Sequence, residues 1–76
     1  MKTGLVEIDR DGNVYYQRKS IQLDMLRKEI QGISKETPFL IRADRSIPLQ
    51  NFVDVLDLIK KTGFKKVSLQ TEEMKN

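Results

Sequence analysis

Residues 39–70 decide the fold, and they read FLIRADRSIPLQNFVDVLDLIKKTGFKKVSLQ. The continuous apolar run at 39–41 is typical of a strand that is buried on both faces at the centre of a sheet. Apolar residues then recur at helical spacing over 49–59, and Gly63 suits the position after a helix. Residues 67–69 alternate between apolar and polar, as in a half-buried strand. The stretch therefore predicts a β-α-β unit whose two strands are parallel.

The residues before this unit predict a hairpin and another helix. Branched and aromatic residues at 5–8 and 14–16 flank an Asp-Gly turn signal at 9–13. Apolar residues spaced by three and four then mark one helical stripe over 23–33. The predicted order is ββαβαβ, an α/β domain of the two-layer α+β kind. Since each helix carries one apolar stripe, both should pack on one face of a small mixed sheet.

With 76 residues, the chain has room for one domain. We expect residues 1–4 to be a linker or added residues, 5–70 to be the domain, and 71–76 to be a polar tail. Neither a signal peptide pattern nor an apolar stretch long enough to span a membrane is visible in the sequence.

The sequence contains no cysteine and no histidine. This excludes disulfides, thiolate metal sites and the usual nucleophile and base pairs, and it argues against an enzyme. Asp9, Asp11 and Gly12 imitate the middle of a calcium loop, but Arg18 stands where such a loop needs a bidentate glutamate. A hairpin turn is the favoured interpretation. We therefore expect no catalytic residues, no cofactor and no metal.

Two interpretations of the end of the 39–41 strand stay open. Arg42, Asp44 and Arg45 cluster where small α/β domains often place functional loops. Alternatively, Asp44 stabilises the turn and the arginines are solvated or pair with it. Elsewhere, Leu58 lies off the apolar stripe of its helix. Tyr15, Tyr16 and Phe64 are also expected to be partly exposed.

Residues 39–48 and 52–72, FLIRADRSIP and FVDVLDLIKKTGFKKVSLQTE, resemble the carboxy-terminal periplasmic domain of the ExbD/TolR biopolymer transport family. The Arg-Ala-Asp-Arg sequence at 42–45 is closer to the ExbD branch. The upstream hairpin and the first helix also fit the order of elements in that family. The likeness extends over roughly residues 5–72.

The resemblance implies a non-catalytic subunit of an inner-membrane, proton-driven complex. In that family a periplasmic domain dimerises and contacts TonB or TolA, while an amino-terminal helix carries the proton-responsive carboxylate within the ExbB or TolQ pore. That helix is not among these residues, so the resemblance assigns no proton-coupling residue. We expect a homodimer, and contact with a partner through an exposed edge strand. The expected contact residues are Arg42, Asp44, Arg45, Leu58, Lys66, Val67, Ser68, Leu69 and Gln70.

A second function from another class remains open. The formal charge is +3, and lysine pairs at 60–61 and 65–66 could attract RNA or another anionic ligand to a cytoplasmic module. The sequence shows no GxxG loop, aromatic-rich RNA-binding strand, zinc ligand set or phosphate-binding glycine motif. We therefore favour partner binding and expect no nucleic acid.

Overall fold

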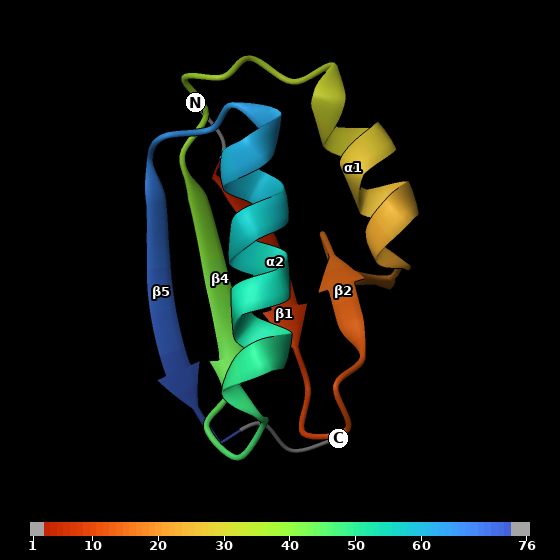
Figure 1. Ribbon diagram of the computed structural model, residues 1–76, viewed down its shortest axis with the longest axis vertical. Coiled ribbons are helices and arrows are strands. Elements are labelled where there is room, and N and C mark those ends of the chain that lie inside the picture. The colour runs from red at the N-terminus through yellow and green to blue at the C-terminus, as the bar shows by residue number, and fades with distance from the viewer. Residues whose placement is uncertain (1–2, 74–76) are drawn as a thin grey trace.

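The computed structural model describes residues 3–73 and shows one sheet covered by a layer of two helices (Figure 1). In chain order the elements are β1 (Gly4–Ile8), β2 (Val14–Tyr16), β3 (Lys19–Ser20), α1 (Leu23–Gln31), β4 (Phe39–Asp44), α2 (Leu49–Thr62) and β5 (Val67–Glu72). The predicted ββαβαβ order is confirmed, with one addition. The short β3 was not predicted; it forms because Gln17 and Arg18 take positive φ angles and turn the chain back onto β2.

The sheet is mixed, and its strands follow the order β3-β2-β1-β4-β5. β1 and β2 form the predicted antiparallel hairpin. β4 runs parallel to β1 on one side and to β5 on the other. This confirms the parallel β-α-β unit and places β5 at an edge.

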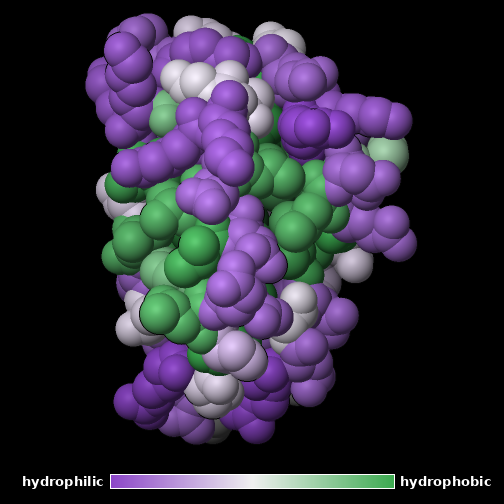
Figure 2. Space-filling view, viewed as in Figure 1, coloured by the Kyte–Doolittle hydropathy of each residue, from purple (hydrophilic) through white to green (hydrophobic). Residues whose placement is uncertain are grey.

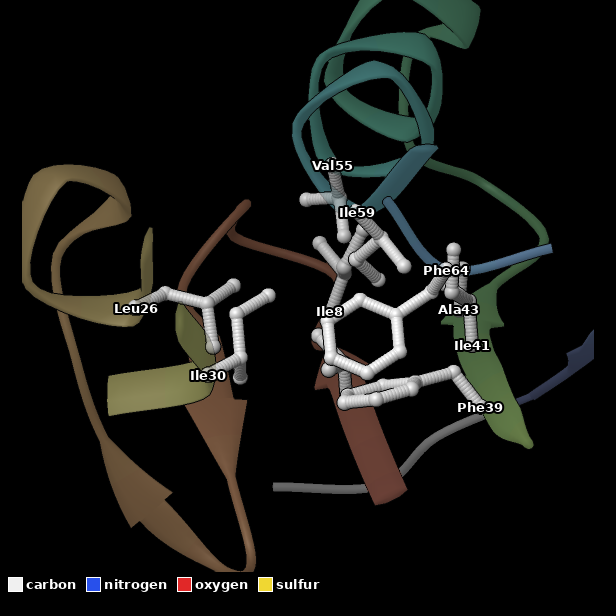
Figure 3. Close-up of a cluster of buried hydrophobic side chains, with 10 residues drawn as sticks. Ile8, Leu26, Ile30, Phe39, Ile41, Ala43, Val55, Ile59 and Phe64 are labelled. Carbon is white, nitrogen blue, oxygen red and sulfur yellow. The ribbon is translucent and has the colours of Figure 1, made fainter. Parts of the chain in front are cut away.

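Both helices pack on the same face of the sheet (Figure 3). Leu26 and Ile30 of α1 and Val55 and Ile59 of α2 are fully buried there. The sheet contributes these core residues: Val6, Ile8, Phe39, Ile41 and Ala43. All of them alternate along their strands, as the pleat requires for side chains that share one face.

The prediction that β4 is buried on both faces was wrong. Leu40 and Arg42 alternate with the buried residues of β4 and are only half-buried. Helices cover one face of the sheet, so the other face of β4 stays partly open. A run of apolar residues in a central strand therefore overstated its burial.

Phe64 was expected to be partly exposed, yet it is fully buried. Gly63 takes a left-handed φ of 117° at the end of α2, a conformation that suits glycine. The chain then turns back, and the rings of Phe64 and Phe39 lie 4.6 Å apart. Lys35 Nζ covers the Phe64 ring at 4.7 Å from its centroid. Tyr15 and Tyr16 are half-buried, as predicted.

β1 begins at Gly4, which lies against the ring of Phe39. A methyl group at Gly4 would lie 2.5 Å from Cε2 of Phe39, closer than atoms can approach. Gly4 also donates its backbone N–H to the Pro38 carbonyl at 2.8 Å. A residue with a side chain would therefore not fit at position 4 unless the Phe39 ring moved.

Candidate partner-binding surface

β5 is an edge strand, and among residues 3–73 no strand pairs with its outer side. Phe39 N–H donates to the Lys66 carbonyl at 2.7 Å, and Arg45 N–H donates to the Glu72 carbonyl at 3.0 Å. In a parallel ladder such bonds recur at every second residue. The even-numbered residues of β5 therefore bond to β4, and the backbone N–H and C=O groups of residues 67, 69 and 71 face outward.

The side chains of β5 divide between the two faces of the sheet. Val67 and Leu69 pair in register with the buried residues Phe39 and Ile41, so they share the face that the helices cover. Ser68 and Gln70 lie on the opposite, open face. Leu69 remains 49% exposed, because α2 does not extend over the edge.

Apolar side chains of α2 continue this exposed strip. Phe52 and Leu56 are half-buried and, like Val67, pack against the core, and Leu49 is 74% exposed. Figure 2 shows hydrophobic surface along the flank of α2 that faces β5. We call Leu49, Phe52, Leu56, Val67 and Leu69 the apolar shelf. The predicted contact residues Val67 and Leu69 thus belong to a larger surface, which the sequence analysis did not identify.

The structure does not bring Arg42, Asp44 and Arg45 together as one site. Asp44 is buried, and its Oδ1 accepts hydrogen bonds from the backbone N–H and the hydroxyl of Ser46 at 2.8 and 2.6 Å. Arg10 Nε lies 3.9 Å from its other oxygen. Arg45 is exposed and pairs with Glu73 at 2.8 Å. Asp44 thus stabilises the turn, as in one of the two interpretations that the sequence left open, while the partner of Arg45 is Glu73.

Arg42 lies on the open face of the sheet and links three strands. Its Nη1 lies 3.4 Å from Oε2 of Glu7 on β1, and its Nη2 pairs with Oε1 of Glu72 on β5. All three side chains are half-buried. Neither glutamate was predicted from the sequence as a partner of Arg42, since their proximity depends on the strand register. The bridge ties the edge strand to the centre of the sheet.

Leu58 and Lys66 lie away from the apolar shelf. Leu58 is half-buried on the side of α2 that faces α1. Lys66 Nζ lies 3.7 Å from Glu36, in an exposed pair before β5. The nine predicted contact residues therefore separate into an edge-strand group and several isolated positions.

Asp9 organises the hairpin turn and is buried, at 6% exposure. Its carboxylate accepts hydrogen bonds from the backbone N–H groups of Asp11 and Asn13, the Asn13 side chain and the Tyr15 hydroxyl. Burial alone would raise the pKa of Asp9, but the hydrogen bonds outweigh it and lower the pKa. The same bond to Asp9 is the main cause of a raised pKa at Tyr15.

The carboxylates give no sign of a metal centre in the part of the chain that the structure describes. There, no group of three or more potential ligand side chains is placed to hold an ion. The oxygens of Asp9 that made the turn look like a calcium loop serve the hydrogen bonds just described. Over the same residues, neither helix has the length and hydropathy to cross a bilayer.

Known proteins place the chain in a family. Residues 1–74 match the family model described as biopolymer transport protein ExbD/TolR. A biopolymer transport protein ExbD of Aquifex aeolicus is 32% identical over 65 residues, which cover 86% of this chain and 49% of that protein. A putative biopolymer transport protein, ExbD-like 2, of Helicobacter pylori is 28% identical over 71 residues, or 93% and 53% of the two chains. The chain spans about half the length of these relatives. It belongs to the ExbD/TolR biopolymer transport family.

Proposed function

We propose that this chain is the partner-binding periplasmic domain of a subunit in a proton-driven, energy-transducing transport complex. In this proposal an extended segment of a TonB- or TolA-type protein adds as a strand to the outer side of β5. The observation that carries the proposal is the open edge of β5, where three residues direct backbone groups outward beside the apolar shelf. Family membership supports the transport role.

If a strand is added, affinity and selectivity come from different parts of this surface. The outward N–H and C=O groups of residues 67, 69 and 71 supply main-chain hydrogen bonds to any extended segment. Selectivity comes from Leu69 and Phe52, which offer apolar contact to alternate side chains of the incoming strand. β5 carries no lysine or proline between Val67 and Glu72, the residues that commonly protect an edge strand.

A second copy of the domain is the other occupant that we propose for this edge. A homodimer would bury the same outward groups, so dimerisation and partner binding would compete. We also propose that the half of the relatives outside the matched region corresponds to an inner-membrane anchor, which joins an ExbB- or TolQ-type protein. Whether the complex serves outer-membrane import or envelope integrity follows from the partner.

An NMR titration tests the proposal. The isotope-labelled chain is titrated with periplasmic segments of TonB and TolA type. We expect one of them to shift the amide signals of β5 and of the apolar shelf, with the outward N–H groups protected from exchange. Unmoved β5 amides with both segments would refute the proposed contact.

A variant at Thr71 separates main-chain pairing from side-chain contact. Thr71→Pro removes one outward N–H group while leaving the bonds to β4 intact, because edge strands tolerate proline there. We expect it to lower the affinity for the partner segment by about tenfold. That loss corresponds to the net stabilisation of roughly one to two hydrogen bonds. Thr71→Ala is the matched control and should bind as the parent does. Equal binding by both variants would contradict strand addition.

A further inference from the structure

α1 and α2 lie side by side and run in the same direction (Figure 1), with an open groove of about 820 Å³ between them. Its apolar floor includes Leu23 and Leu58, which are half-buried and pack against the core. Figure 2 shows this hydrophobic surface on the side of α2 that faces α1. The groove lies on the opposite flank of α2 from β5, so it is a separate surface from the apolar shelf.

Charge is arranged along the groove in a definite order. Asp24 of α1 and Asp54 of α2 line one end, where it passes the start of α1. Lys61, in the last turn of α2, and Lys35, just beyond α1, line the other end. Asp57 and Arg27 lie between them, so the groove carries three carboxylates and three cations.

The opposite charges do not neutralise one another across this groove. Among residues 3–73, no ion pair joins its carboxylates to its cations. Lys35 is engaged at the end of α1, where its Nζ donates to the Gln31 carbonyl at 2.7 Å. Asp54 accepts a hydrogen bond from Gln50 at 2.7 Å. Lys61 and Asp54 thus form two separate poles, about 10 Å apart by the helical rise of seven residues.

We propose that this groove binds an extended protein segment in which one basic and one acidic residue flank an aliphatic side chain. In an extended chain, residues at positions one, three and five point to the same side and span about 13 Å. The aliphatic side chain would cover Leu58, the base would meet Asp24 and Asp54, and the acid would meet Lys61. Acids early and bases late in a helix also complement its dipole. That effect explains the order of the charges but not the apolar hollow between them.

Three blocked pentapeptides test the proposal in NMR titrations of the full chain: Lys-Ala-Leu-Ala-Glu, Lys-Ala-Leu-Ala-Lys and Glu-Ala-Leu-Ala-Glu. Each exposed ion pair contributes up to about 1 kcal/mol, or roughly fivefold in affinity. We therefore expect the mixed peptide to bind about fivefold more tightly than the other two and to shift amides of α1 and α2. Equal affinities, no binding, or shifts confined to other elements would overturn the proposal.

A charge reversal in the groove provides the decisive control. Lys61→Glu should transfer the preference from the mixed peptide to the doubly basic one. Lys60→Glu makes the same change in the same helical turn but outside the groove, and it should leave the preference unchanged. A similar change in both variants would overturn the proposal. Thr71→Pro should bind the pentapeptides normally, so failure of the β5 contact and failure of the groove can be distinguished.

Discussion

β4 and β5 are parallel neighbours of six residues each, but they differ in how their side chains are used. Residues on the helix-facing side of β4 are fully buried, whereas their register partners in β5 are half-buried or exposed. The two strands share a hydrogen-bonded ladder and one helix connects them. The difference arises because α2 covers β4, whereas β5 lies beside α2 and is only partly covered (Figure 1).

The contrast means that β4 and β5 contribute unequally to the free energy of folding. Burial of Phe39 and Ile41 contributes to the free energy of folding, as does any apolar area removed from water. Leu69, in register with Ile41, stays 49% exposed and therefore contributes less to the free energy of folding. A domain of this size has a small core, and exposing apolar area in an edge strand costs it some stability.

The largest effect is expected at one register pair, Phe39 of β4 and Val67 of β5. Phe39→Ala should lower the free energy of unfolding by about 3 to 5 kcal/mol, whereas Val67→Ala in β5 should lower it by about 1 kcal/mol. Urea denaturation followed by circular dichroism measures both. If Phe39→Ala does not fold, Phe39→Leu should still cost about 1.5 kcal/mol. Equal losses at the two positions would remove the distinction between the strands.

A second test concerns Asp9, the buried carboxylate in the turn that follows β1. Asp9→Asn should lower the free energy of unfolding at neutral pH by about 1 to 3 kcal/mol, since it removes a carboxylate that accepts four hydrogen bonds. The folded-state pKa of Asp9 is lowered. Its contribution is therefore complete above the unfolded pKa of about 4 and is lost as the pH falls through the folded pKa.

The measurement compares urea midpoints of the parent and Asp9→Asn across acidic pH. The difference between them should narrow as the pH falls below about 4. Asp57→Asn, at an exposed position of α2, controls for the loss of a carboxylate as such. If the difference between the two urea midpoints stays constant down to strongly acidic pH, the charge of Asp9 does not stabilise the fold.

A third test compares the two faces of β5. Leu69→Ala should weaken a bound partner segment by about tenfold, because it removes apolar contact beside the new strand. Gln70→Ala changes the open face and should leave affinity within about threefold. Neither variant should change the free energy of unfolding by more than about 1 kcal/mol. Isothermal titration calorimetry measures the affinity. A greater loss of affinity with Gln70→Ala than with Leu69→Ala would indicate that the partner contacts the open face instead.

The smallest expected effect is that of salt. If the partner segment binds by strand addition, its affinity should fall less than about threefold when the salt concentration rises about tenfold. An anionic ligand held by four lysines, such as Lys60, Lys61, Lys65 and Lys66, would lose roughly three orders of magnitude in affinity, through counterion release. Titrations of the partner segment and of a single-stranded RNA at two salt concentrations distinguish the two. Tight, steeply salt-dependent RNA binding would favour the second function.

Much of the fold follows from local patterns in the sequence. The helical spacing of the apolar residues predicted α1 and α2, and Gly63 marked the end of α2 where the structure has its left-handed turn. The Asp-Gly signal located the hairpin, although the hydrogen bonds that Asp9 accepts from the Asn13 side chain and the Tyr15 hydroxyl were not expected. The prediction failed for Phe64 because its burial depends on contact with Phe39, 25 residues away in the chain.

The surface was harder to predict than the fold. The alternation at 67–69 predicted a half-buried strand, but the β4 residues that lie beside Val67 and Leu69 depend on the register. Arg42 and Asp44 are two positions apart in β4, a spacing that places side chains on one face of a strand. Their roles differ because the chain turns directly after β4, where Asp44 bonds to Ser46, while Arg42 pairs with Glu7 and Glu72 of the neighbouring strands. Partners distant in sequence, such as Glu7 and Arg42, become visible only once the strand order is known.

The parallel pairing of β1 with β4 has a consequence for how quickly the domain folds. Paired residues in these strands are 35 positions apart, as for Glu7 and Arg42, while those of the β1–β2 hairpin are ten or fewer apart. Loop closure makes distant contacts slow to form. The hairpin is therefore expected to form early and the central pair late. Until β1 meets β4, both inner edges of the future sheet are open, and this interval is when the chain is most prone to aggregate.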